Sequence, residues 1–103
     1  MKLIKMLSEM IEEELDGAEE YVHHAIKTKE TNPALAKTFY DISLQEMDHV
    51  SKLHDEVVKI IDTYRKEHGD PPESMMAIYE YMHERHMKQA SAIKNNQAHY
   101  RET

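Results

Sequence analysis

Glycine and proline punctuate this chain at a few points and divide it into three long segments. The 103 residues contain two glycines and three prolines, and the breaks fall at Pro33 and in the stretch from Gly69 to Pro72. Between the breaks, apolar residues recur at steps of three and four, the period of one face of an α-helix. Gly17 alone lies inside a segment and is expected to be a weak point there. The sequence therefore predicts one all-α domain, residues 1–103, with helices over about residues 2–30, 33–68 and 71–98.

The breaks carry residues that are typical of helix starts. Asn32 suits an N-cap, and Pro33 suits the first helical position, where its missing N–H is not needed. Asp70 is expected to cap the third helix, with Pro71 in its first turn and Glu73 at the capping-box spacing. Because both connections are short, consecutive helices should be antiparallel neighbours in an up-down-up bundle.

Charge and cysteine content narrow the function classes. Acidic residues outnumber basic ones by 20 to 13, and the formal net charge of −7 argues against nucleic acid or an anionic membrane as the natural partner. No stretch approaches the roughly 20 apolar residues of a membrane span, and the amino terminus lacks a signal-type apolar core, so we expect a cytoplasmic protein. Cysteine is absent, so any metal must be held by nitrogen and oxygen ligands.

The second segment shows two apolar faces, more than one neighbouring helix would cover. We therefore expect a homodimer or a larger homo-oligomer. The main face comprises Leu35, Phe39, Ile42, Leu53, Val57, Ile60 and Tyr64, and the other comprises Leu44, Met47, Val50, Val58 and Ile61.

Two polar residues, Glu46 and His49, interrupt the main apolar face of the second segment. Residues three apart on a helix differ by about 60° in rotation and about 4.5 Å in rise, so both side chains can reach one point in the bundle interior. A carboxylate buried there without a partner is costly, whereas a cation bound to both groups offsets that cost. The Glu-x-x-His pair therefore favours a metal site. The alternative is a buried polar pair that fixes the register of a dimer.

The first segment supplies partners for this pair. Its apolar face continues through Glu14 and Tyr21, and in a hairpin that turns near residues 31–32, residue 46 lies level with about residue 17. Both side chains are therefore expected to cluster with the Glu-x-x-His pair, with Glu14 as the third metal ligand. Glu20 and Glu13 fall further round the helix, on an acidic surface, and are reserve ligands.

This arrangement resembles the first half of the di-iron carboxylate proteins of the ferritin superfamily, such as bacterioferritin, rubrerythrin and the encapsulated ferritins. The resemblance covers about residues 10–62 and rests on Glu14, on Tyr21 two turns later and on the Glu46-x-x-His49 pair. It implies a ferritin-like antiparallel helical hairpin whose Glu and His side chains bind metal. In that superfamily a second pair of helices completes a two-metal site.

This chain has only one further helix, so dimerisation would have to supply the missing half. Two copies of Glu14, Glu46 and His49 provide four glutamates and two histidines, as in the encapsulated ferritins, and complete a four-helix-type bundle. The resemblance thus implies two iron ions per dimer, with manganese as the other metal that suits these ligands, and a ferroxidase-type oxidation of Fe²⁺. It gives Tyr21 a candidate catalytic role, in which it accepts an electron or hydrogen-bonds a ligand carboxylate, whereas a core aromatic residue is the ordinary alternative. An iron store would require an enclosing shell, made by many copies or by another protein.

The third segment carries its own cluster, with a second Glu-x-x-His pair at Glu80 and His83. His83 is a candidate metal ligand, either in a separate site with His54, Glu84 and His86 or as a neighbouring chain's contribution to the first site. The alternative to a metalloprotein is a metal-free helical interaction or assembly protein of ferritin-like fold. A third hypothesis is a groove on the second helix that binds a partner helix.

Overall fold

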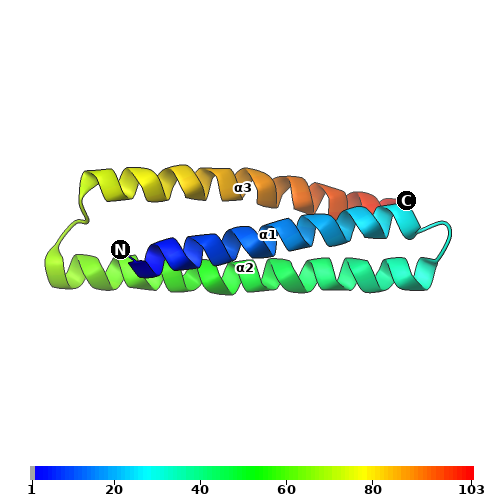
Figure 1. The fold of residues 1–103 in the computed structure, drawn as a ribbon, viewed down its shortest axis with the longest axis horizontal. Coiled ribbons are helices and arrows are strands. Elements are labelled where there is room, and N and C mark those ends of the chain that lie inside the picture. The colour runs from blue at the N-terminus through cyan, green and yellow to red at the C-terminus, as the bar shows by residue number, and fades with distance from the viewer. Residues whose placement is uncertain (1) are drawn as a thin grey trace.

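Three α-helices, each antiparallel to the one before it, form the part of the chain that the computed structural model describes, residues 2–103. They are α1 (Lys2–Thr28), α2 (Pro33–His68) and α3 (Glu73–Glu102). The bundle is elongated, with extents of 56 × 19 × 18 Å, and α1 and α2 form a tight hairpin with α3 returning alongside (Figure 1). The all-α prediction is confirmed. None of the three helices, over residues 2–103, is long and apolar enough to cross a membrane.

The first connection follows the sequence prediction and the second departs from it. The side chain of Asn32 caps α2 by accepting a hydrogen bond from the backbone N–H of Leu35 at 3.2 Å. At the second connection the predicted Asp70 cap is wrong, because α3 begins at Glu73 without a side-chain cap. Asp70 instead lies 3.6 Å from Arg65 of α2. Gly69 ends α2 with a φ of 79°, which side chains with a Cβ rarely adopt.

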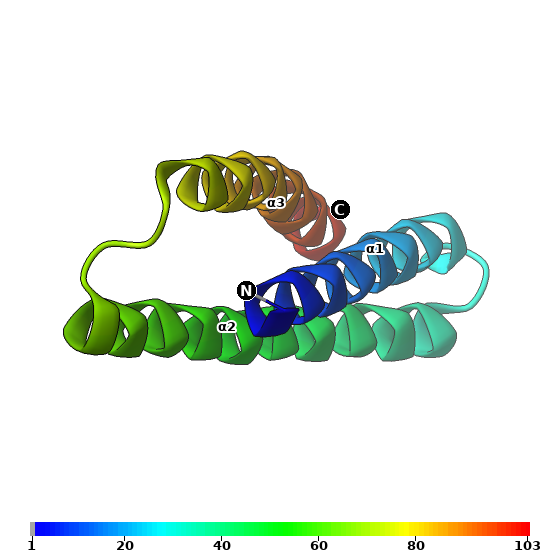
Figure 2. The ribbon, with the colours of Figure 1, turned by 60° about the vertical axis from the view of Figure 1, so that its left-hand side comes forward.

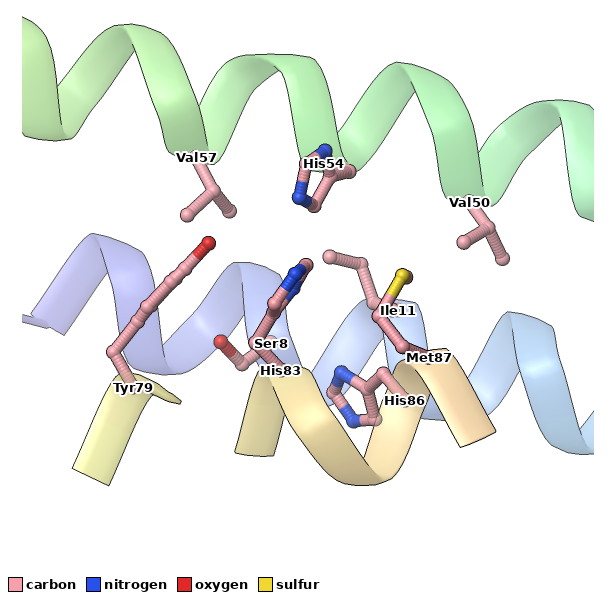
Figure 3. A pocket seen from close by; sticks show the side chains of 9 residues that line it. All are labelled: Ser8, Ile11, Val50, His54, Val57, Tyr79, His83, His86 and Met87. Carbon is pink, nitrogen blue, oxygen red and sulfur yellow. The ribbon is translucent and has the colours of Figure 1, made fainter. Parts of the chain in front are cut away.

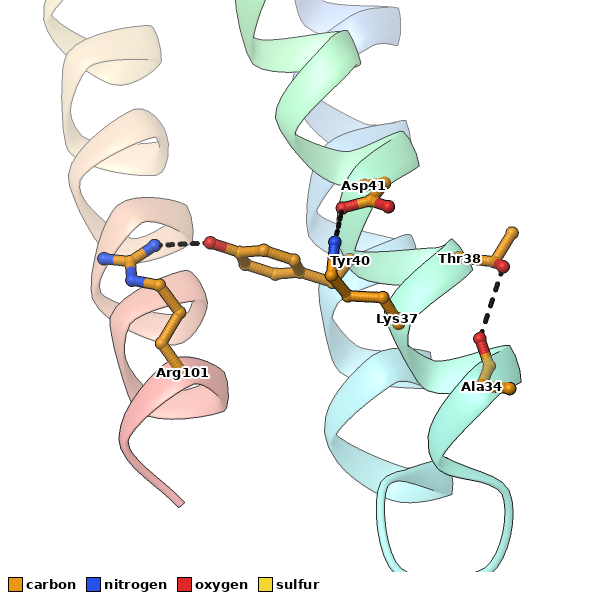
Figure 4. A network of polar contacts seen from close by, with 6 residues as sticks. All are labelled: Ala34, Lys37, Thr38, Tyr40, Asp41 and Arg101. Atoms are coloured by element: carbon orange, nitrogen blue, oxygen red, sulfur yellow. Dashed lines mark hydrogen bonds and ion pairs between the residues drawn. The ribbon is translucent and has the colours of Figure 1, made fainter.

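The third helix also continues beyond its predicted end near residue 98, to Glu102. The extra turn carries Tyr100, which is buried and stacks on Tyr40 of α2 with ring centroids 4.5 Å apart. Arg101 Nη1 donates a hydrogen bond to the Tyr40 hydroxyl at 2.7 Å (Figure 4). Tertiary packing of this aromatic pair therefore extends the helix past the point where its apolar pattern weakens.

Two clusters of buried apolar residues lie between the helices, and a polar link also crosses the bundle. Ser43, fully buried on α2, donates a hydrogen bond to the backbone carbonyl of Ala18 at 2.7 Å. The buried Gln97 side chain of α3 donates in turn to Ser43 Oγ at 3.0 Å. This chain of bonds connects all three helices at one level. The main apolar cluster comprises Leu7, Ile11, Leu15, Ala18, Val50, Val57, Ile61, Ala90 and Ile93.

The third helix covers only one side of the α1–α2 hairpin. It packs mainly against α1, and Figure 2 shows it starting away from α2 and approaching the hairpin toward its carboxyl end. Its polar side chains bond to Glu12, Asp16, Glu19 and His23 of α1. Glu14, Gly17 and Tyr21 each lie two residues from an α1 residue that α3 contacts, and a step of two residues on a helix turns about 160° round its axis. These three residues therefore lie on the side of the hairpin opposite α3, which is here called the open face. On α2 the open face carries Phe39, Ile42, Glu46 and His49.

Candidate functional site

The Glu46 carboxylate lies directly against the backbone of Gly17. A Cβ built on Gly17 would overlap Glu46 Oε2 and would lie 2.9 Å from its Cδ. This contact confirms the predicted level of residue 46 opposite residue 17. It also gives Gly17 a role that the sequence analysis missed, because the absent side chain makes room for a carboxylate between two helices. The signal in the sequence was a lone glycine inside a helical pattern, which often marks such a close approach.

The same carboxylate has an electrostatic environment that disfavours its charge. Glu46 Oε2 is buried and has no hydrogen-bond partner. Burial raises the pKa of Glu46 above its ordinary value of 4.5, and the nearby Glu14 and Glu20 carboxylates raise it further, while His49 opposes the shift. A cation close to Glu46 would offset both the lost hydration and the repulsion between carboxylates.

Glu14 and His49 meet beside this carboxylate. His49 Nδ1 lies 3.3 Å from Glu14 Oε2, and the two side chains are 53% and 31% exposed. The structure therefore brings together the three residues that the sequence analysis named as ligands. Within residues 2–103, however, no group of three His, Asp or Glu side chains is arranged so that it could hold a metal ion. Whether Glu14, Glu46 and His49 bind a metal therefore stays a prediction.

The two accessory candidates lie at the edge of this cluster. Tyr21 packs its ring against Phe39 of α2, with centroids 6.0 Å apart, and is half-buried. This is the environment of an aromatic residue at the rim of a core, and the catalytic role of Tyr21 stays a prediction. Glu20 is exposed and pairs with His24 at 3.7 Å, yet it is close enough to act on the Glu46 pKa. Its role as a reserve ligand stays a prediction.

His83, the remaining predicted ligand, lies in another part of the bundle. Its ring stacks on His54 of α2, with centroids 5.0 Å apart, and on Tyr79 of its own helix at 5.7 Å (Figure 3). The buried His86 lines the same small cavity. Glu84, which the sequence analysis placed with these histidines, is exposed and pairs with Lys88 at 3.8 Å. The structure thus forms a histidine cluster without its predicted carboxylate.

Apolar side chains flank the carboxylate cluster along the open face. The helical spacing that leads to Glu14 and Gly17 on α1 also passes through Leu3 and Met10, both of which are exposed. On α2 the corresponding series runs from the exposed Leu35 to half-buried side chains on both sides of Glu46 and His49. These are Phe39, Ile42, Leu53 and Ile60. The carboxylates therefore lie at the centre of an apolar strip.

No protein-family model, no curated protein and no solved structure matches this chain. The resemblance to the ferritin superfamily therefore rests on the sequence spacing of Glu14, Tyr21, Glu46 and His49.

Proposed function

We propose that two copies of this chain associate through the open face and bind two iron ions through Glu14, Glu46 and His49 of each copy. The observation that carries this proposal is the Glu46 carboxylate, whose Oε2 atom is buried against Gly17 with no hydrogen-bond partner and which lies beside a second carboxylate and an imidazole. Such a group is costly in a metal-free bundle. Its cost is offset when a cation is bound.

The shape of the site supports a shared centre. The three side chains lie on the side of the hairpin opposite α3, where an apolar strip surrounds them. A second copy placed on this strip would cover exposed apolar side chains and bring in a second Glu14, Glu46 and His49. Four carboxylates and two imidazoles are the donor set of two iron or two manganese ions in a four-helix bundle.

The activity that follows is oxidation of Fe²⁺ as a substrate. Two Fe²⁺ ions give up two electrons, which with two protons reduce dioxygen to hydrogen peroxide or hydrogen peroxide to water. In this chain the carboxylates would favour the more highly charged Fe³⁺ product, and Glu46 would lose its proton as the cation binds. Tyr21, within the open face, is the residue to test for a redox role, in which its phenol would give up one electron and one proton to the oxidant and would be restored by one electron from Fe²⁺ and one proton.

An iron-storage role requires another component. The bundle is only 19 × 18 Å across its two shorter extents, so a single chain encloses no space for mineral. We therefore propose that any stored iron is held by an enclosing shell, built from many copies or from another protein.

The runner-up function is a metal-free interaction or assembly protein. It is favoured by the arrangement of the described residues, among which no set of three His, Asp or Glu side chains is placed to hold a metal ion. In that case Glu46, with its raised pKa, would remain as a polar contact that fixes how two copies align.

The experiment that separates these functions is an anaerobic Fe²⁺ titration of metal-stripped protein, followed by exposure to air. Bound iron per chain and the ferric absorbance are measured, and native mass spectrometry gives the number of chains. The test variant is Glu46→Gln. Asp48→Asn is the matched control, because Asp48 lies two residues away, is exposed and pairs with Lys52 at 3.0 Å.

The proposed function predicts about one iron per chain in a dimer, with binding and oxidation lost in Glu46→Gln and retained in Asp48→Asn. Absence of iron binding in a wild-type dimer would overturn it in favour of the interaction protein. Equal iron binding by both variants would show that surface carboxylates, and not this cluster, hold the metal.

A further inference from the structure

A second group of potential ligands lies inside the bundle, away from the open face. A cavity of about 20 Å³, enough for one water molecule or one metal ion, lies between the three helices. Its polar lining comprises three histidines, one tyrosine and one serine, and the other lining residues are apolar (Figure 3). The polar residues are Ser8, His54, Tyr79, His83 and His86.

His86 is the residue that indicates an occupant. Its side chain is only 4% exposed, and its Nε2 atom is buried without a hydrogen-bond partner. A buried imidazole nitrogen that lacks a partner costs free energy unless a water molecule, a ligand or a metal ion satisfies it. The cavity beside it therefore lies where such a partner would bind.

Two further imidazoles face the same space from two helices. His83 precedes His86 by three residues, so both lie on one side of α3. His54 comes from α2, and Figure 3 shows it pointing toward His83 across the cavity. Burial lowers the pKa of both His83 and His86 below 6.5, and His54 lowers that of His83 further. Neutral imidazoles are the form that binds transition metals.

We propose that His54, His83 and His86 bind one transition-metal ion of the Zn²⁺ type, with a fourth position left for water. Three imidazoles and a water molecule are an established zinc donor set. Because no three donors converge among residues 2–103 as they stand, binding requires His54 and His83 to leave their ring stack and turn their nitrogen atoms toward His86. The site is independent of the proposed iron site, which uses none of these residues.

The bound ion would connect α3 to α2 where the two helices are poorly joined. Figure 2 shows the first half of α3 leaning away from α2, and α3 packs mainly against α1. A metal held by His54 on one side and by His83 and His86 on the other would act as a crosslink between these helices. It would therefore stabilise the folded chain in addition to occupying the cavity.

The test is a titration of metal-stripped protein with Zn²⁺ by calorimetry and with Co²⁺ by visible absorbance, at a pH above 7. Both are made in the Glu46→Gln background, so that failure of the iron site does not affect the result. The test variants are His54→Gln, His83→Gln and His86→Gln. The control is His99→Gln, an exposed histidine on α3.

The proposal predicts one Zn²⁺ per chain, a Co²⁺ spectrum of four-coordinate intensity, and a higher melting temperature with Zn²⁺. Each test variant should weaken binding by more than about tenfold, while His99→Gln should leave it unchanged. Because His86→Gln alters the core, the half-buried His54 and His83 variants carry the decision, with folding verified by circular dichroism. Absence of a bound ion, or binding that survives His54→Gln and His83→Gln, would mean that the cavity holds water only and would overturn the proposal.

Discussion

The Glu46 side chain occupies the space that a side chain on Gly17 would otherwise fill. The two residues lie so close together that a Cβ on Gly17 would overlap Glu46 Oε2. The glycine and the carboxylate therefore form a unit in which one residue gives up helix stability so that the other can lie between two helices. Removing either residue should have consequences that depend on the other.

Replacing Gly17 with alanine tests this dependence. In an ordinary helix interior Gly→Ala stabilises by roughly 0.5–1 kcal/mol. Here the new methyl group has to displace the Glu46 carboxylate, so Gly17→Ala alone should give less than this gain or a loss. In a Glu46→Ala background the same change should give the full gain. Urea unfolding of the four proteins measures the difference, and equal effects of Gly17→Ala in both backgrounds would show that the two residues are uncoupled.

The raised pKa of Glu46 predicts an unusual dependence of stability on pH. In the folded protein the Glu46 carboxyl binds a proton more readily than at its ordinary pKa of 4.5. Between pH 4.5 and the raised pKa of folded Glu46, the folded state therefore binds more protons than the unfolded state. This carboxyl consequently destabilises the metal-free fold most at neutral pH. The destabilisation by the Glu46 carboxyl should therefore become smaller as the pH falls toward 4.5. Glu46→Gln should be more stable than wild type at pH 7, and the difference should shrink in acid, as followed by chemical unfolding with a chelator present.

The histidine cavity predicts the opposite trend. The pKa values of His83 and His86 are lowered from 6.5 mainly by burial. His54 lowers the pKa of His83 further, and Arg85 and His83 lower that of His86, where Glu12 and Asp16 oppose the shift. Below pH 6.5 the unfolded chain takes up protons that the folded chain resists, so stability should fall as the pH falls from there. Above pH 6.5, His83 and His86 should not make the free energy of unfolding depend on pH. A His83→Gln/His86→Gln variant, measured with chelator from pH 8 to 5, should lose this part of the dependence, and an unchanged slope would contradict the assignment.

Ser43 predicts a large effect from a small substitution. It is fully buried, donates to the Ala18 carbonyl and accepts from the Gln97 amide. Ser43→Ala leaves both groups buried without this partner, which costs about 1–3 kcal/mol. Ser91→Ala, at an exposed position of α3, should change the unfolding free energy by less than about 0.5 kcal/mol. A neutral Ser43→Ala would indicate that water replaces the hydroxyl.

The parts of the fold that could be predicted from sequence are those fixed by local chemistry. The positions of glycine and proline predict the number of helices, and capping preferences predict the Asn32 cap. Hairpin geometry predicts that Glu46 lies level with Gly17. The start of α3 could not be predicted, because Asp70 satisfies the capping pattern but lies against Arg65 instead. A local pattern cannot show which of two competing partners an exposed carboxylate will contact.

The proximity of Glu14, Glu46 and His49 was predictable from the sequence, whereas the side of the hairpin that α3 covers was not. Helical phase was enough to bring Glu14, Glu46 and His49 together, because side chains at matching levels of a hairpin must meet. The helical spacing of the apolar residues could not show which side of the hairpin α3 would cover, because α2 has two apolar faces. That choice leaves the candidate ligands on the open face and places His83 in a separate cavity.

The two faces of the hairpin can be distinguished by matched substitutions. Met10 on the open face is 42% exposed, and Leu44 on the other side of α2 is 39% exposed, so a glutamate at either position should cost the isolated chain similarly little. If two copies pair through the open face, Met10→Glu buries a charge in the interface and should yield monomers, whereas Leu44→Glu should remain dimeric. Sedimentation or light scattering over a range of concentrations measures this. Dissociation by Leu44→Glu alone would assign the interface to the other face, and the Glu14, Glu46 and His49 clusters of two copies would then never meet.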